Sequence, residues 1–127
     1  MTVLIDSWAW IEYFKATSKG ELSRKYIEGD EEIIVSTMNV AEIYNFLLKN
    51  MSKEADQHIE FILKASFVVP VSTEIALTAA KNKNKMNFGM ADAIVLSTAT
   101  ANNANIVTGD ADFIGLANVI FIGEGKA

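Results

Sequence analysis

Short apolar runs alternate along the chain with longer segments in which apolar residues recur every three or four positions. The runs are rich in Val and Ile and predict five buried strands, at Thr2–Ile5, Glu32–Ser36, Phe67–Val71, Asn105–Thr108 and Val119–Ile122. The segments between them predict amphipathic helices, each with one apolar stripe to lay on a sheet. This alternation predicts an α/β fold with a five-stranded, mostly parallel sheet flanked by helices.

Two of the predicted helices have unusual apolar patterns. Met90–Ala101 is apolar almost all round, which predicts a buried helix. In the helix that follows the second strand, some large apolar residues lie off the core stripe, and we expect them to meet a second copy of the chain: Phe46, Leu48 and Met51. A later helix has the stripe Ala55, Ile59, Ile62 and Leu63.

Length and composition narrow the class of protein. The 127 residues suit one domain, which we place at residues 1–122, with a loose C-terminal tail at 123–127. The net charge of −5 argues against a protein that coats nucleic acid, because such proteins need a basic surface. Cysteine is absent, which excludes disulfides and thiolate metal sites and suits a reducing cytoplasm. No apolar stretch predicts a membrane span.

Acidic residues recur where predicted strands end and helices begin. They are Asp6 after the first strand, Glu42 early in the helix after the second, Asp92 in the first turn of the buried helix, and Asp110 and Asp112 after the fourth strand. Parallel α/β folds bind ligands at this edge of the sheet. No Lys or Arg occurs between Met86 and Gly125, so nearby cations in the sequence do not balance the last three acids. A cluster of oxygen ligands without His or Cys suits Mg²⁺ or Mn²⁺.

Each acid also has a plain structural interpretation. Asp6 is suited to cap the first helix, and Glu42 to lie on a solvated helix face. Asp92 is favoured in a first turn by the helix dipole. Asp110 and Asp112 are typical turn residues, and we expect one of them to cap the short helix that contains Phe113. Their joint position along one sheet edge favours a metal site over five separate coincidences.

Four segments, which in order span nearly the whole chain, resemble the PIN domain family and in particular the single-domain toxins of VapC type: Val3–Phe14, Asn39–Ile43, Gly89–Ala99 and Ile106–Phe113. The resemblance implies a Rossmann-like sheet and Mg²⁺- or Mn²⁺-dependent hydrolysis of RNA to a 5′-phosphate and a 3′-hydroxyl. It also implies an acidic cluster with hydroxyl support, made of Asp6, Glu42, Asp92 and Asp110 with Ser7 and Thr108. Because a second acid follows, the fourth ligand is Asp110, Asp112 or both.

The predicted roles follow from phosphodiester chemistry, which needs an activated water, charge neutralisation and a stabilised leaving oxygen. We expect Asp6 and Asp92 to be the central metal ligands. Glu42 is expected to orient or deprotonate the water, or to bind a second ion through water. A basic run, Lys81, Lys83 and Lys85, is a candidate guide for the RNA backbone. The expected partners are RNA, a second copy and an antitoxin protein.

Two alternatives remain within this fold: a non-catalytic RNA-binding or scaffold subunit, and an RNA-processing nuclease outside a toxin system. A receiver-like domain should have an acidic pair after the first strand, a phospho-acceptor Asp after the third and a Lys near the end. It fits poorly, because the first strand is followed by one acid, the third by Pro70, Val71 and Ser72, and no Lys occurs between residues 86 and 125.

Overall fold

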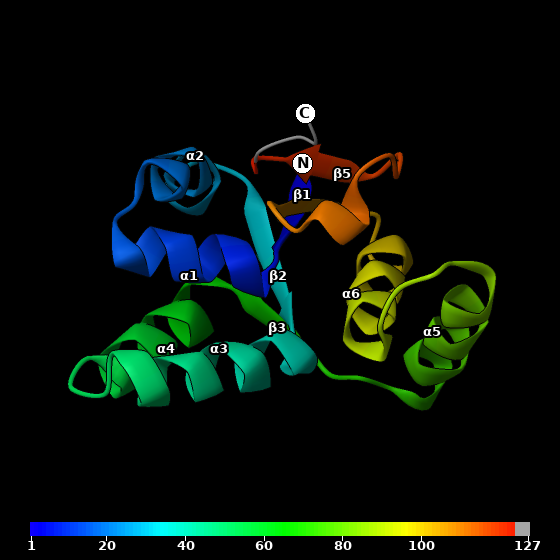
Figure 1. The fold of residues 1–127 in the computed structure, drawn as a ribbon, viewed down its shortest axis with the longest axis horizontal. Helices are drawn as coiled ribbons and strands as arrows, with labels where there is room; N and C mark the ends of the chain where they lie inside the picture. Colours follow the sequence, from blue (N-terminus) through cyan, green and yellow to red (C-terminus); the bar gives the residue numbers. More distant parts are fainter. Residues whose placement is uncertain (124–127) are drawn as a thin grey trace.

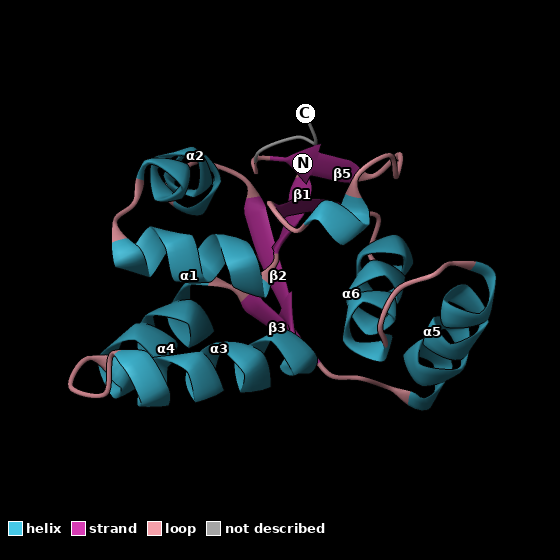
Figure 2. Cartoon of the chain, in the orientation of Figure 1, coloured by secondary structure: helices cyan, strands magenta, loops and turns pink. Residues whose placement is uncertain are grey.

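The computed structural model describes residues 1–123, which form one α/β unit around a parallel sheet (Figure 2). The strands are β1 (Thr2–Ile5), β2 (Glu32–Ser36), β3 (Phe67–Val69), β4 (Asn105–Thr108) and β5 (Val119–Phe121). They lie in the order β3-β2-β1-β4-β5, and every neighbouring pair is parallel. The predicted fold class is confirmed, and the sheet is parallel throughout its five strands.

Helices cover both faces of the sheet (Figure 1). On one side lie α1 (Ser7–Lys15), α2 (Ser18–Ile27), α3 (Thr37–Asn50) and α4 (Ala55–Ala65). On the other side lie α5 (Thr73–Lys85) and α6 (Met90–Ala101), and a 3₁₀ turn, η1 (Ala111–Phe113), follows β4. The sheet therefore forms the middle layer of three, as the buried strands β1, β2 and β4 require. The prediction that all five strands are buried is wrong for the edge strands β3 and β5, which are partly exposed because each has a neighbour on one side only.

Successive residues of the central strand feed two separate cores. Val3 and Ile5 pack with the helices α1 to α4, whereas Leu4 packs with α5 and α6. This alternation follows from the pleat, which turns successive side chains to opposite faces. As predicted, α6 is buried over most of its length, since its residues from Ala93 to Ala99 are all inaccessible or nearly so.

Two element boundaries and one core assignment differ from the prediction. β3 ends at Val69 instead of Val71, because Pro70 has no N–H to continue the ladder. β5 ends at Phe121, one residue before Ile122. Leu63, predicted to be in the core, is 47% exposed, because the face of α4 that packs on the core carries Ala55 and Ile62 and leaves Leu63 at its margin.

The remaining predictions concern the chain end, membrane spans and the off-stripe residues. Of the predicted tail, residues 124–127 lie outside the described residues. Within residues 1–123 every helix is too short or too polar to cross a bilayer. Phe46 and Met51 pack partly against the α1–α4 core, whereas Leu48 is 48% exposed.

Candidate functional site

Five acidic side chains stand at the edge of the sheet where β1, β2 and β4 end. Asp6 directly follows β1, and Glu42 projects from the second turn of α3, which follows β2. Asp92 lies in the first turn of α6, and Asp110 and Asp112 lie in the turn after β4. Up to about a hundred residues separate these segments in the sequence, but they meet because parallel strands end at the same edge of the sheet. The acids therefore lie together at one edge, as predicted.

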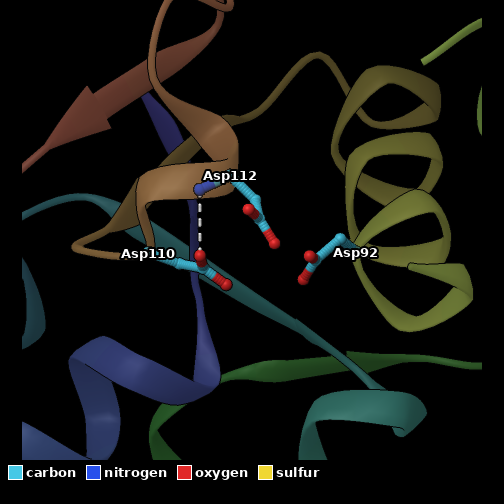
Figure 3. Close-up of side chains that lie close together, drawn as sticks. All are labelled: Asp92, Asp110 and Asp112. Atoms are coloured by element: carbon cyan, nitrogen blue, oxygen red, sulfur yellow. Dashed lines mark hydrogen bonds between the residues drawn. The ribbon is translucent and has the colours of Figure 1, made fainter. Parts of the chain in front are cut away.

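Three of the acids converge most closely. Each of Asp92, Asp110 and Asp112 presents a carboxylate oxygen, and these oxygens all lie within 4.8 Å of one another. Figure 3 shows the Asp92 side chain reaching from α6 towards Asp112, with the Asp110 carboxylate beside them. Asp112 is exposed and the other two are half-buried. Both acids after β4 thus reach Asp92, which keeps both as candidate ligands.

The loop after β4 is shaped by Asp110 and Thr108. The Asp110 Oδ1 atom accepts from the backbone N–H of Asp112 at 3.0 Å and caps η1, so the expected cap is Asp110 (Figure 3). The backbone N–H of Asp110 in turn donates to the Thr108 hydroxyl at 3.0 Å. This turn fixes the Asp110 backbone and leaves the second carboxylate oxygen facing the cluster.

Asp6 is buried, with 5% of its surface exposed. Although it stands at the N-cap position of α1, its carboxylate makes no capping bond to that helix. Its Oδ2 atom accepts from the Thr108 hydroxyl at 2.8 Å, and its Oδ1 atom accepts from the Asn39 side chain at 3.2 Å. The cap interpretation of Asp6 is therefore wrong, because Thr108 at the end of β4 and Asn39 in α3 hold its side chain instead.

Glu42 is exposed on α3, but its carboxylate is tied to the same edge. The Ser7 hydroxyl donates to Glu42 Oε1 at 2.8 Å. Ser7 thus supports Glu42, and Thr108 supports Asp6, which are different partners for the two predicted hydroxyls.

The electrostatics of the cluster disfavour full ionisation of the acids. Burial, with smaller contributions from the charges of Glu42 and Asp110, raises the pKa of Asp6 to about 6, although the Thr108 hydrogen bond opposes the shift. Burial and the charge of Asp110, together with the close approach of Asp112, raise the pKa of Asp92 to about 7. At neutral pH the crowded carboxylates therefore gain from any cation placed among them.

The donor set fits a hard divalent ion. It consists of carboxylate oxygens, and Mg²⁺ and Mn²⁺ favour such ligands. Asp92, Asp110 and Asp112 would hold the ion. Asp6 lies close enough to influence the charge of Asp92, but it does not belong to the group of oxygens within 4.8 Å. The structure therefore brings Asp92 to the centre of the cluster and sets Asp6 at its buried side.

A close packing contact links the two halves of the site. The six-membered ring of Trp8, in the first turn of α1, lies directly against Gly109, and a Cβ atom at position 109 would overlap it. Trp8 thus supports the backbone that carries Asp110, immediately after Gly109. Glycine is required here by close approach of a ring and not by an unusual φ angle.

The predicted basic run lies at the end of α5. Lys81, Lys83 and Lys85 are exposed there. Helical geometry places Lys81 and Lys85 on one face and Lys83 on another, and the Lys83 ammonium donates to the backbone oxygen of Phe88 at 3.4 Å. The three lysines therefore do not form one row.

Sequence reasoning gave no role to Asn39, which is completely buried in the first turn of α3 and bonds directly to Asp6. A signal was present: Asn39 occupies the same helical stripe as the core residues Ile43 and Leu47, at intervals of four. A polar residue on a core stripe must find buried hydrogen-bond partners.

A hollow at the opposite edge of the sheet is less suited to this chemistry. It has a volume of about 430 Å³ and lies among the starts of the strands, near Thr2, Glu32 and Phe67. Glu32 is the single carboxylate in its lining, so it offers no comparable group of metal ligands.

The comparisons with known proteins agree with this geometry. The model of the PIN domain family matches residues 3–119, and the chain belongs to the PIN domain family. A search of curated proteins gives no match.

Several solved structures with the same fold are toxins or toxin–antitoxin complexes. A toxin–antitoxin complex from Klebsiella pneumoniae contains a chain with a TM-score of 0.81 and 19% identity, with 96% of this chain and 98% of that chain covered. VapBC2 from Rickettsia felis, bound to a promoter DNA fragment, gives a TM-score of 0.73 at 17% identity, with 98% of each chain covered. VapC20 from Mycobacterium tuberculosis, a toxin that cleaves the Sarcin-Ricin loop, gives 0.68 at 12% identity, with 82% of this chain and 86% of that chain covered. At these identities the likeness establishes the fold.

Proposed function

We propose that the chain is an Mg²⁺- or Mn²⁺-dependent endoribonuclease and the toxin of a toxin–antitoxin pair that acts in the cytoplasm. The observation that carries the proposal is the convergence of Asp92, Asp110 and Asp112, with Asp6 beside them, at the ligand-binding edge of a PIN sheet. The toxin–antitoxin proteins that share the fold, one of which is a toxin that cleaves the Sarcin-Ricin loop, support the choice of substrate and system.

Each side chain has a distinct task in this proposal. A bound divalent ion neutralises phosphate charge and lowers the pKa of water. Asp92, with Asp110 or Asp112, holds the ion, and Asp6 sets the negative potential behind it. Glu42, held by Ser7, accepts a proton from the attacking water or orients it. Lys81 and Lys85 are proposed to attract the RNA backbone towards this edge.

The central test is RNA cleavage by the metal-loaded wild-type protein and by Asp92→Asn. Cleavage should require Mn²⁺ or Mg²⁺, stop on addition of EDTA, and fall by orders of magnitude in Asp92→Asn, because that change removes a central ligand at nearly constant size. Asp30→Asn makes the same chemical change at an exposed turn and should cleave normally. Full cleavage by Asp92→Asn would defeat the nuclease assignment, and RNA binding without cleavage by the wild type would favour the non-catalytic alternative.

The fourth ligand is decided by the pair Asp110→Asn and Asp112→Asn. Asp110 is half-buried and fixed by its cap bond, whereas Asp112 is exposed. We therefore expect Asp110→Asn to weaken Mn²⁺ binding and cleavage more than Asp112→Asn. Equal losses in both variants would mean that the two carboxylates share the role.

The proposed partners follow from charge and from apolar exposure. An antitoxin segment with a basic side chain would complement the acidic cluster. The exposed Leu48 on α3 supports a homodimer, for which light scattering provides the test. A monomer at high micromolar concentration would contradict the dimer.

A further inference from the structure

The buried Asn39 side chain makes three hydrogen bonds at the junction of β1 and α3, one through its amide oxygen and two through its NH₂ group. Its Oδ1 atom accepts from the backbone N–H of Ser36 at 3.1 Å. Its Nδ2 group donates to Asp6 Oδ1 at 3.2 Å and to Ser7 Oγ at 2.9 Å. An amide offers one acceptor oxygen and two N–H donors, so these three contacts match Asn in a way that neither Asp nor Ser reproduces.

The direction of each hydrogen bond is fixed by the chemistry of its partners. A backbone N–H can only donate, which orients the amide oxygen of Asn39 towards Ser36 and its NH₂ group towards Asp6. The Ser7 hydroxyl has one proton and donates it to Glu42 at 2.8 Å, so Ser7 accepts from Asn39. Two branches therefore leave one amide: Asn39 to Asp6, and Asn39 through Ser7 to Glu42.

This arrangement addresses a problem specific to the site. Asp6 and Glu42 repel each other, and Glu42 is an exposed side chain with several rotatable bonds. Asn39 has no charge, so it can donate to the buried carboxylate without neutralising the cluster that is to attract a cation. The Ser7 branch selects one orientation of Glu42 from many.

We propose that Asn39 is a positioning residue that fixes Asp6 directly and Glu42 through Ser7. The inference deepens the proposed function, on which it rests for its place in catalysis. Groups that orient metal-binding carboxylates typically change metal affinity or activity tenfold to a hundredfold when they are removed.

The competing explanation is that Asn39 serves only the start of α3. Asn39 and Ser36 form a capping box, in which the Ser36 hydroxyl accepts from the N–H of Met38 at 3.0 Å. Ser36→Ala removes this side-chain cap but keeps the backbone N–H that orients Asn39. It is therefore the matched control for loss of helix capping alone.

The experiment titrates Mn²⁺ into wild type, Asn39→Ala, Ser7→Ala, the double variant and Ser36→Ala, with the thermal midpoint as the signal and RNA cleavage measured in parallel. We expect Asn39→Ala and Ser7→Ala each to raise the Mn²⁺ requirement by about tenfold or more. The Mn²⁺ requirement is the concentration that gives half of the maximal increase in the thermal midpoint or half of the maximal cleavage rate. In the double variant the Mn²⁺ requirement should rise by less than the product of the two single increases, because both changes break the same series of hydrogen bonds from Asn39 through Ser7 to Glu42. Ser36→Ala should lower the metal-free midpoint and leave the Mn²⁺ requirement within about twofold.

A conservative variant and two outcomes make the result decisive. Ser7→Thr keeps the hydroxyl and should restore the Mn²⁺ requirement that Ser7→Ala loses, even if Asn39→Ala proves too unstable to purify. An unchanged Mn²⁺ requirement in both Asn39→Ala and Ser7→Ala would overturn the proposal and leave Asn39 as a helix cap. A wild type that binds Mn²⁺ but cleaves no RNA would defeat the proposed function alone, since the binding titration still tests Asn39.

Discussion

Replacing the buried Asp6 by Asn should stabilise the metal-free protein while it disables the site. Burial and neighbouring acids raise the pKa of Asp6 from 3.8 to about 6. At pH 8 the wild-type carboxylate is ionised in a place that disfavours its charge. Because one pKa unit is worth about 1.4 kcal/mol, keeping this charge in the folded state costs roughly 3 kcal/mol.

The Asn side chain recovers part of that cost. Asp6 accepts one hydrogen bond on each oxygen, from Asn39 and from Thr108, and an amide can accept only on its single oxygen. The lost hydrogen bond costs about 1 kcal/mol. The net expectation is a gain of about 2 kcal/mol, or roughly 5 to 8 °C in Tm for a domain of this size.

The assay is a thermal melt at pH 8 in EDTA and again in millimolar Mn²⁺. Asp6→Asn should melt above the wild type in EDTA, and its advantage should shrink or reverse in Mn²⁺, because only the intact cluster gains stability from the bound ion. Asp30→Asn, an exposed change of the same kind, should follow the wild type in both buffers. A lower Tm for Asp6→Asn in EDTA would refute the reasoning, since it would make the Asp6 carboxylate a net stabilising contact.

Two further predictions use other features of the site. Asp6 and Asp92 have pKa values of about 6 and about 7 in the folded state, above the 3.8 of an ordinary Asp, so the folded state retains protons that the unfolded state has released. The free energy of unfolding of the metal-free protein should therefore fall as the pH rises from about 4 to about 7 and then level off. Urea melts that show a rise in stability across this range would contradict the prediction. Gly109→Ala should destabilise the protein by about 1–3 kcal/mol, because the added methyl overlaps the Trp8 ring, and Trp8→Leu in the same chain should restore part of the lost stability. Denaturant melts in which Gly109→Ala is as stable as the wild type would show that the Trp8 ring can shift to make room.

The chain pattern was sufficient to predict the sheet because each strand is a short apolar run bounded by polar or turn residues. Only β1, β2 and β4 are buried over most of their length, whereas the edge strands β3 and β5 are partly exposed. It also placed Asp92 and Asp110 at one edge, since the strand ends of a parallel sheet coincide. It could not determine the length of β3, where Pro70 ends a ladder that apolar pattern alone would extend to Val71. The prediction placed Leu63 in the core because it borders the apolar stripe of its helix. Whether a residue at the border of a stripe is buried depends on the neighbouring elements that pack against it, which the helical pattern does not show.

The hydrogen bonds of the site were harder to predict than its acids. Asp6 has the sequence position of a helix cap, and only the approach of Thr108 and Asn39 from other segments shows that its side chain turns elsewhere. Such long-range contacts leave no local pattern. The one usable signal was Asn39 itself, a polar residue on the stripe that includes Ile43 and Leu47.

The strand order also determines when the cluster can exist during synthesis. β1 is made first but lies between β2 and β4, so one of its edges stays unpaired until residues 105–108 have left the ribosome. Asp92 and Asp110 come from segments more than eighty residues after Asp6. A nascent chain shorter than this has no assembled acidic cluster, however well its first helices have formed. Translation thus delays the appearance of the site until nearly the whole of the sheet can close.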